Sequence, residues 1–402
     1  MNANIAKYNF IPILISFFAN PFLTILYIFG SLRNANYNRW YPCLVSLFFG
    51  LLAYTQYAPN ADINRSYHSM IAIGDFNSQE LLMFLAFDKY KLYTILNYVI
   101  YQITGNVQIT SLIWGSSIYL FIFFALENLR KYYGASNHRY VFPSYLATIF
   151  CFVIFVEAME TIKQAVGFSL FLYSFSLFLL NERKKAIVIF LVSLGVHMSQ
   201  LFLLPLVLCK TIKTKYLLLL TVLSFAFRTF NLMLLVNSLS GILGLEVLSL
   251  LAEGYVDQSF DNFSSSAPYF QLTYGVLLSF VIIHGVLLNK KDPMVTNLTL
   301  IFIIILNLNY SNNHNYTRLL LHSFPIWIMI YMSFMHNIRS IITKRHVVCA
   351  MLFLTFMLQA WFSIGRFGTD ENEYQCSFMG NSIVNIVTSS IFGYLTYDVP
   401  VN

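Results

Sequence analysis

Long apolar runs separated by short polar loops dominate the chain. A run of about 20 apolar residues crosses the hydrocarbon core of a bilayer as a helix. The pattern therefore predicts an all-α polytopic integral membrane protein with about ten transmembrane helices. Their expected ranges are 10–30, 40–57, 107–126, 140–156, 161–180, 216–236, 269–288, 295–310, 319–335 and 347–362, and the loops between them are marked by charge, Asn, Gly or Pro.

The apolar segment 186–208 does not fit as a simple span, because a basic cluster lies at each end of it. One crossing would place one of these clusters outside, against the positive-inside rule. We therefore expect a re-entrant or broken helix there, with its tip near His197 at about half the depth of the membrane. A continuous span is the alternative, and it would invert every later loop.

The segment 78–105 is also apolar but carries Asp88, Lys89 and Lys91. We expect it to be an amphipathic helix that lies on the outer interface. With this choice most acids face outward, including those of the loop 246–261, and most basic residues face the cytoplasm. No linker or internal repeat divides the chain, so residues 1–402 are expected to form a single integral membrane domain.

Composition agrees with the hydropathy pattern and excludes other classes. Of 402 residues 58% are hydrophobic and only 10% are charged, whereas soluble domains carry about 25% charged residues. The net charge of +7 comes from residues scattered in short loops, so it indicates topology and not a nucleic-acid partner. The five cysteines form no CxxC pair, and no phosphate-binding loop or HExxH motif is present. We therefore expect no metal and no cofactor.

Five solitary cations lie where predicted spans meet the outer face, outside the clusters that set orientation. Arg binds phosphate through paired hydrogen bonds and Lys binds it as a point charge, so the set predicts a shared anion site at the outer interface. The alternative is that each cation reaches lipid phosphate or pairs with a nearby acid. The five residues are Arg65, Lys163, Arg228, Arg318 and Arg366.

Polar residues beside these cations complete the expected site. Tyr67, Gln164 and Asn315 lie within three residues of a solitary cation and are candidate ligands for sugar or phosphate oxygens. Asp62, Glu157 and His197 are the candidate catalytic residues, because each can take a proton from an acceptor hydroxyl. A structural role is the alternative for His197, since a lone His in an apolar stretch often only joins two helices.

Three motifs of this sequence resemble the EpsG-like and Wzy families of bacterial polysaccharide polymerases. They are ADINRSY at 61–67, the run from Lys163-Gln164 to Val196-His197-Met198-Ser199, and NYTRLLLHSFPI at 315–326. Those families usually carry Arg-Gln where this chain has Lys163-Gln164, and Phe-His-x-Ser where it has Val196 to Ser199. Lys keeps the charge but not the paired hydrogen bonds of Arg.

The resemblance implies a membrane glycosyltransferase that acts on the outer face of the bacterial inner membrane. Such an enzyme transfers a glycan from undecaprenyl pyrophosphate to the non-reducing end of another lipid-linked repeat unit, as in O-antigen or capsule synthesis. The implied partners are this lipid-linked oligosaccharide, the bilayer and a chain-length regulator protein. The alternatives are a flippase for the same lipid, an O-antigen ligase, and an acetyltransferase that would use His284.

Overall fold

The computed structural model describes residues 10–34, 36–57, 62–88, 90–135, 138–226, 228, 267–367, 377–379 and 382–399. At residues 62, 139, 314, 365–367 and 377–378 only the backbone is described. The predicted acidic loop 246–261 and the end of the predicted span 216–236 lie outside the described residues.

Among the described residues five helices are long and apolar enough to cross a membrane, and the prediction of an all-α polytopic membrane protein is confirmed. They are Gln108–Tyr132, Ile162–Leu179, Pro268–Leu288, Asn315–Asn337 and Ile341–Ile364. Seven apolar helices within the described part are shorter than these. The helix Ile341–Ile364 buries only 22% of its apolar window inside the protein, which leaves an apolar surface of the kind that lipid covers.

The chain forms two compact units. Unit 1 contains residues 1–201 and 361–402, and unit 2 contains residues 202–360. The prediction of a single integral domain stays a prediction.

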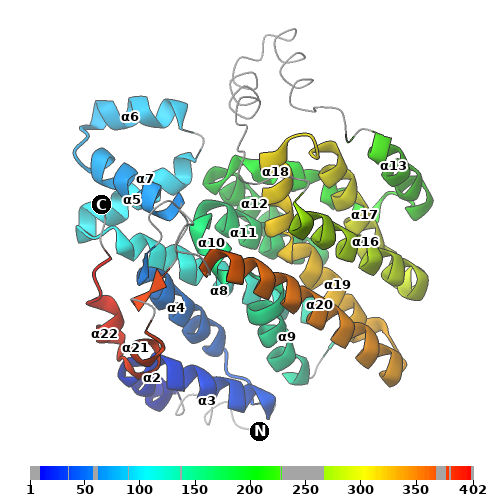
Figure 1. The fold of residues 1–402 in the computed structure, drawn as a ribbon, viewed down its shortest axis with the longest axis horizontal. Helices are drawn as coiled ribbons and strands as arrows, with labels where there is room; N and C mark the ends of the chain where they lie inside the picture. Colours follow the sequence, from blue (N-terminus) through cyan, green and yellow to red (C-terminus); the bar gives the residue numbers. More distant parts are fainter. Residues whose placement is uncertain are drawn as a thin grey trace. The chain divides into compact units, whose positions relative to one another are not determined.

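Unit 1 is built on four helices that pack in chain order, α4 on α8, α8 on α11 and α11 on α12 (Figure 1). Their bounds are Tyr41–Tyr54, Gln108–Tyr132, Ile162–Leu179 and Arg183–Val196. Gly50 of α4 lies directly against α8, because a Cβ added there would be 2.5 Å from the carbonyl oxygen of Leu112. Small residues at such a crossing let two helix backbones approach closely.

The predicted span 10–30 is two helices, α2 (Phe10–Ala19) and α3 (Pro21–Arg33). Asn20 between them accepts a hydrogen bond from the backbone N–H of Leu23, 2.9 Å away, and so caps α3. Pro21 follows at the first position of α3 and has no N–H to continue α2. The sequence dipeptide Asn20-Pro21 therefore divides the apolar run.

The predicted span 140–156 is also interrupted. A 3₁₀ turn, η1 (His138–Tyr140), leads into α9 (Val141–Ala147) and then into a π-helical turn, η2 (Thr148–Phe152). The chain becomes extended at Val153 and Ile154 before α10 (Phe155–Glu160). Glu157 and Glu160 of α10 are both buried, so this break delivers two acids into unit 1 directly before α11.

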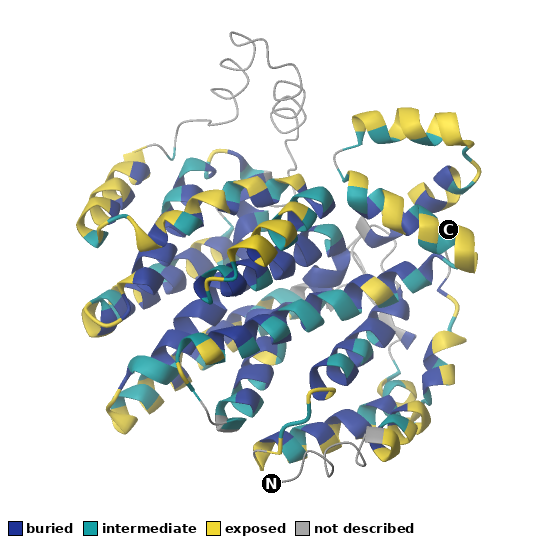
Figure 2. Ribbon diagram, turned by 180° about the vertical axis from the view of Figure 1, so that it is seen from behind, coloured by how far each residue is buried: buried dark blue, intermediate teal, exposed yellow. Residues whose placement is uncertain are grey.

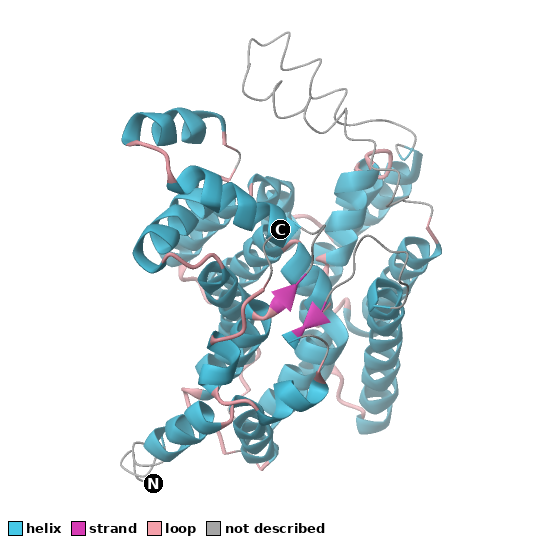
Figure 3. Cartoon of the chain, turned by 60° about the vertical axis from the view of Figure 1, so that its left-hand side comes forward, coloured by secondary structure: helices cyan, strands magenta, loops and turns pink. Residues whose placement is uncertain are grey.

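Unit 1 also joins early and late parts of the chain. Strand β1 (Gln56–Tyr57) pairs antiparallel with β2 (Ser377–Phe378), as Figure 3 shows. The helices α21 (Ile383–Thr388) and α22 (Ile391–Leu395) follow, and α22 packs on α4. The carbonyl oxygen of Leu395 accepts a hydrogen bond from the Tyr54 phenol at 3.0 Å.

The segment 78–105 is helical, as predicted, but forms two helices instead of one. These are α6 (Ser78–Phe87) and α7 (Lys91–Thr104), with Asp88 between them accepting hydrogen bonds from Thr94 and from the Tyr90 backbone. None of the residues in α6 is buried (Figure 2). In contrast, α7 buries Tyr93 and Asn97 and packs against α5 (Asp62–Gly74), α8 and α12.

The predicted break within 186–208 is confirmed. The helix α12 ends at Val196, His197 is extended, and a 3₁₀ segment, η3 (Met198–Lys210), follows. The helix α12 runs back along most of α11, and the depth of its end in the membrane stays a prediction. The Ser174 hydroxyl donates to the carbonyl of Ala186, and the Ser193 hydroxyl donates to the carbonyl of Gly167.

Unit 2 is centred on α17, whose residues are nearly all buried and which packs against α13, α16, α18 and α19. The bounds are α13 Thr214–Ala226, α16 Pro268–Leu288, α17 Pro293–Leu308, α18 Asn313–Leu321 and α19 Phe324–Asn337. The last helix, α20, is Ile341–Phe367, and its residues from Trp361 onward belong to unit 1. His284 bonds to Thr296 at 2.9 Å and to Ser333 at 2.8 Å, and Ser333 donates to Asp292 at 2.6 Å. This buried network ties α16, α17 and α19 together.

Candidate functional site

A pocket in unit 1 gathers polar side chains from three helices. Ser66 comes from α5, Tyr93, Thr94 and Asn97 come from α7, and Lys163 comes from α11. Asn97 is held in place, since its carboxamide oxygen accepts a 2.6 Å hydrogen bond from the indole of Trp114. The pocket therefore brings together hydroxyls, an amide, an aromatic ring and one cation.

Lys163 brings the positive charge to this pocket. Its ammonium nitrogen lies 4.8 Å from the ring centre of Tyr90 and 5.4 Å from that of Tyr93. Both distances are within the range of cation–π attraction, which holds a cation without neutralising it. The side chain is half-buried, so the charge acts in a medium that screens it less than water does.

His197 lies on the same tyrosine. Its ring centre is 4.9 Å from that of Tyr90, and the side chain is buried. The Nδ1 atom accepts from the backbone N–H of Ser199 at 3.3 Å and is 2.6 Å from the Ser199 hydroxyl. Because a backbone N–H can only donate, Nδ1 carries no proton and Nε2 carries it. The arrangement suits His197 to donate a hydrogen bond more than to accept a proton.

Two buried amides lie next to these groups. Gln200 is fully buried, and neither polar atom of its carboxamide has a hydrogen-bond partner among the described residues. It packs on Gly167, where an added Cβ would lie 2.6 Å from the Gln200 Nε2 atom. The carboxamide oxygen of buried Gln164, one turn earlier on α11, likewise has no partner in the described part of the chain.

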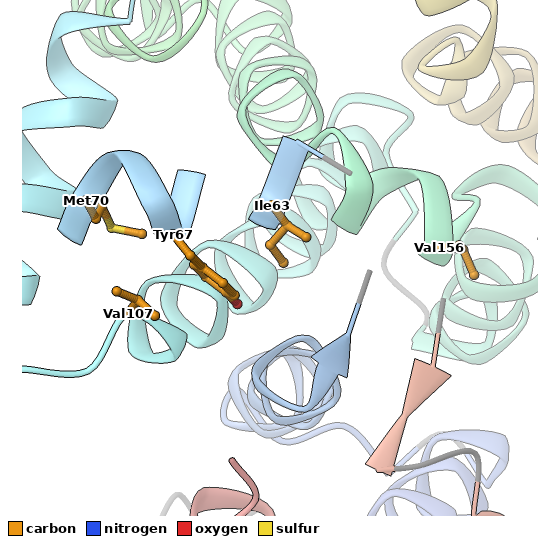
Figure 4. Close-up of a cluster of buried hydrophobic side chains, with 5 residues drawn as sticks. All are labelled: Ile63, Tyr67, Met70, Val107 and Val156. Atoms are coloured by element: carbon orange, nitrogen blue, oxygen red, sulfur yellow. The ribbon is translucent and has the colours of Figure 1, made fainter. Parts of the chain in front are cut away.

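Other predicted site residues of unit 1 have different surroundings. Tyr67 points into the core beside Ile63, Met70 and Val107 (Figure 4), and its hydroxyl bonds to Ser111. Burial raises the pKa of the Tyr67 phenol well above its ordinary value. Tyr67 therefore anchors α5 to α8, and its contact with substrate stays a prediction.

The remaining predicted residues of unit 1 do not line the pocket, or their side chains lie outside what the structure describes. Arg65 is exposed, one position before pocket residue Ser66. Glu157 is 3% exposed in α10. Asp62 occupies the first position of α5, four residues before Ser66. The side chains of Asp62 and of Arg366, near the end of α20, lie outside what the structure describes.

Three predicted residues belong to unit 2. Arg228 lies among aromatic rings after α13, and Asn315 and Arg318 are on α18. Asn315 is buried, and Arg318 is half-buried. The structure thus divides the predicted set of cations between the two units, with Lys163 and Arg65 in unit 1 and Arg228 and Arg318 in unit 2.

Sequence reasoning missed Tyr90, Tyr93, Asn97, Ser66 and Gln200. A signal for three of them was present, since Tyr90, Tyr93 and Asn97 recur at helical spacing in 90–97. No group of three or more His, Cys, Asp or Glu side chains within the described residues could hold a metal. The expectation that no metal takes part stays a prediction.

Comparison with known proteins gives one finding. Residues 39–376 match the model of the EpsG family. No curated protein and no solved structure matches the chain significantly.

Proposed function

The chain belongs to the EpsG family, and from this premise we propose that it polymerises a bacterial cell-surface polysaccharide. As a multi-pass membrane protein of polysaccharide-polymerase type, it would take a glycan from undecaprenyl pyrophosphate. It would pass that glycan to the non-reducing end of a second lipid-linked repeat unit, at the outer face of the inner membrane. No nucleotide sugar enters this reaction.

The observation that carries the proposal is the position of Lys163 at the pocket of unit 1. Its ammonium group lies against Tyr90 and Tyr93, beside the hydroxyls and amide that line the pocket. A sugar pyrophosphate presents ring faces, hydroxyls and negative charge together. Tyrosine rings, polar side chains and a cation are the matching groups.

The bond changes are those of a glycosyl transfer. The acceptor hydroxyl attacks the anomeric carbon of the donor glycan, the bond from that carbon to the pyrophosphate oxygen breaks, and the hydroxyl proton goes to a base. Negative charge develops on the departing pyrophosphate, and a cation fixed there lowers the barrier. We assign this role to Lys163, with Gln164 and Arg65 beside it, and Arg318 and Arg366 as further candidates.

His197 and the acids take separate parts in this proposal. The proton on Nε2 of His197 is suited to donate to a substrate oxygen, since Nδ1 is occupied by Ser199. Asp62 and Glu157 remain the candidates for the base, because an ionised carboxylate accepts the acceptor proton without a change of tautomer. Pyrophosphate leaves readily, so the cation is expected to matter more than the base.

The test is the length of surface polysaccharide in a deletion strain that carries the wild-type protein or a variant. Lys163→Met keeps the side-chain length and removes the charge. Lys163→Arg restores the residue that the family usually has there. The control is Lys185→Met, whose lysine is exposed and pairs with Glu182 at 2.6 Å.

We expect Lys163→Met to remove the ladder of chain lengths and leave single repeat units, whereas Lys163→Arg and Lys185→Met keep the ladder. If the deletion strain also lacks the single unit at the surface, the protein acts in export or ligation and the proposal is wrong. If Lys163→Met gives a full ladder at normal protein level, the cation that stabilises the departing pyrophosphate is not Lys163.

A further inference from the structure

Arg228 in unit 2 occupies a cage of aromatic rings. Its guanidinium carbon lies 4.5 Å from the ring centres of both Tyr274 and Tyr310, and 4.9 Å from that of Phe225. A guanidinium held between aromatic faces keeps its charge and directs its N–H groups outward along its own plane. The cage therefore fixes the orientation of the charge.

One edge of that guanidinium is also fixed by a hydrogen bond. The Nε atom of Arg228 donates to the carboxamide oxygen of Asn307 at 3.0 Å, and the hydroxyl of Tyr274 donates to the same oxygen at 2.9 Å. The amide nitrogen of Asn307 donates to Ser224 at 2.7 Å. Asn307 is fully buried, so it cannot turn to serve another partner without loss of three hydrogen bonds.

A second nitrogen of the guanidinium has no acceptor among the described residues. The Nη2 atom of Arg228 is buried and has no hydrogen-bond partner in the described part of the chain. A buried charged donor without an acceptor is costly. Arg228 therefore presents N–H groups where a further acceptor would lower the free energy.

Neutral polar groups lie beside the cage. Tyr316 of α18 contacts the ring of Tyr310 edge-on, at 5.1 Å between centres. The next residue back, Asn315, is more than nine-tenths buried, and its Nδ2 atom has no partner among the described residues. A second unsatisfied donor on the element that packs against the cage points to a ligand rich in oxygen atoms.

The charge of the cage decides between ligand classes. One cation surrounded by phenols and amides balances one negative charge, whereas a pyrophosphate carries more than one and is better held by several cations. The planar N–H edge of Arg matches two oxygen atoms of a singly charged group. Aromatic faces and amides around it suit a sugar ring.

We infer that the Arg228 cage binds a singly charged oxyanion on the glycan itself, so that the repeat unit which this protein uses is acidic. The oxyanion is either the carboxylate of an acidic sugar or a phosphodiester substituent. This inference rests on the proposed polymerase function, and it gives Arg228 a role in selecting the repeat unit that is separate from binding pyrophosphate.

The first experiment compares substrates in polymerisation by the full-length protein in lipid nanodiscs. Native lipid-linked repeat units are compared with units whose carboxyl groups have been reduced to alcohols. For a carboxylate, the wild type should use the native unit about 10 to 100 times better, and Arg228→Gln should reduce this preference to nearly one. Arg345→Gln, at an exposed Arg of the same unit, is the matched control and should keep the preference.

The second experiment measures binding of the lipid-free oligosaccharide to the same nanodiscs by saturation-transfer NMR. Carboxyl reduction and phosphodiester cleavage are applied separately, so the loss of binding identifies which oxyanion is recognised. Arg228→Lys keeps the charge without the planar edge and should bind at an intermediate level. This variant separates recognition from a failure to fold.

The outcomes distinguish the two proposals. Equal use and equal binding of charged and neutral units by wild type and Arg228→Gln would overturn the inference, as would a glycan with neither carboxylate nor phosphodiester. If no polymer forms from any unit but binding still depends on the oxyanion and on Arg228, the polymerase proposal fails and the glycan site stands.

Discussion

Lys163 and His197 lie on the same ring, that of Tyr90, although Lys163 is on α11 and His197 follows the end of α12. The antiparallel register of α11 and α12 explains this. Gly167 is hydrogen-bonded to Ser193, and the same register continued by one helical turn brings Lys163 opposite His197. A cation at one end of α11 thus meets the residue at which α12 breaks.

The shared ring makes Tyr90 a direct test of the site. Tyr90→Phe keeps the aromatic face and should preserve the polysaccharide ladder. Tyr90→Leu removes the face from both Lys163 and His197 and should shorten the ladder strongly, because cation–π attraction of about 0.5–2 kcal/mol is lost. The measurement is chain length at matched protein level. Equal ladders from the two variants would show that the ring only fills space.

The role of His197 can be separated by substitution. If its Nε2–H donates a hydrogen bond, His197→Gln should retain part of the polymerisation rate, because a carboxamide also donates. His197→Ala should lose about tenfold more, from one hydrogen bond of roughly 1–1.5 kcal/mol. Rates are measured in nanodiscs across pH 5 to 8. His197 would instead act as a base if both variants lose the same fraction of the polymerisation rate and the rate no longer depends on pH near neutrality.

The contact between α4 and α8 predicts a large effect of one methyl group. Gly50→Ala places a Cβ 1.9 Å from the Ser116 hydroxyl and 2.5 Å from a backbone oxygen, so the helices must separate, at a cost of about 1–3 kcal/mol. The melting temperature in detergent should fall by several degrees. Gly30→Ala is the control, since nothing lies within 4 Å of its Cβ. It should be neutral or slightly stabilising.

The loop before α9 predicts a dependence of stability on pH. The ring of His138 stacks on Tyr37 with 4.6 Å between centres, and burial, with Arg130 nearby, lowers the pKa of His138 below its ordinary value of 6.5. Between the lowered pKa and 6.5 the unfolded chain binds more protons, so stability should fall as the pH drops through this window.

The melting temperature of the wild type and of His138→Gln, measured from pH 7.5 to 5, tests this. The neutral Gln side chain should make the acid-side slope shallower. An unchanged slope would mean that another group is responsible.

Hydropathy alone predicted the membrane class, because the cost of placing polar groups in lipid restricts spans to long apolar runs. It also predicted the break near His197. A single span over 186–208 would place one of its two flanking basic clusters on the outer side of the membrane, which is unfavourable. Hydropathy did not predict the divisions at Asn20 and at Thr148–Phe152, where local capping and a π-turn interrupt predominantly apolar runs.

The sequence by itself thus determined the fold class, the family and the presence of Lys163 and His197 at polar breaks. The tertiary structure decided which of the predicted residues share a site. Periodicity shows which face of a helix is apolar but not which helix covers that face. For this reason the sequence did not show that Tyr67 packs in the core while Tyr93 and Asn97 line the pocket. Contacts between helices depend on register and close approach at residues such as Gly167, and these arise only when the chain is packed.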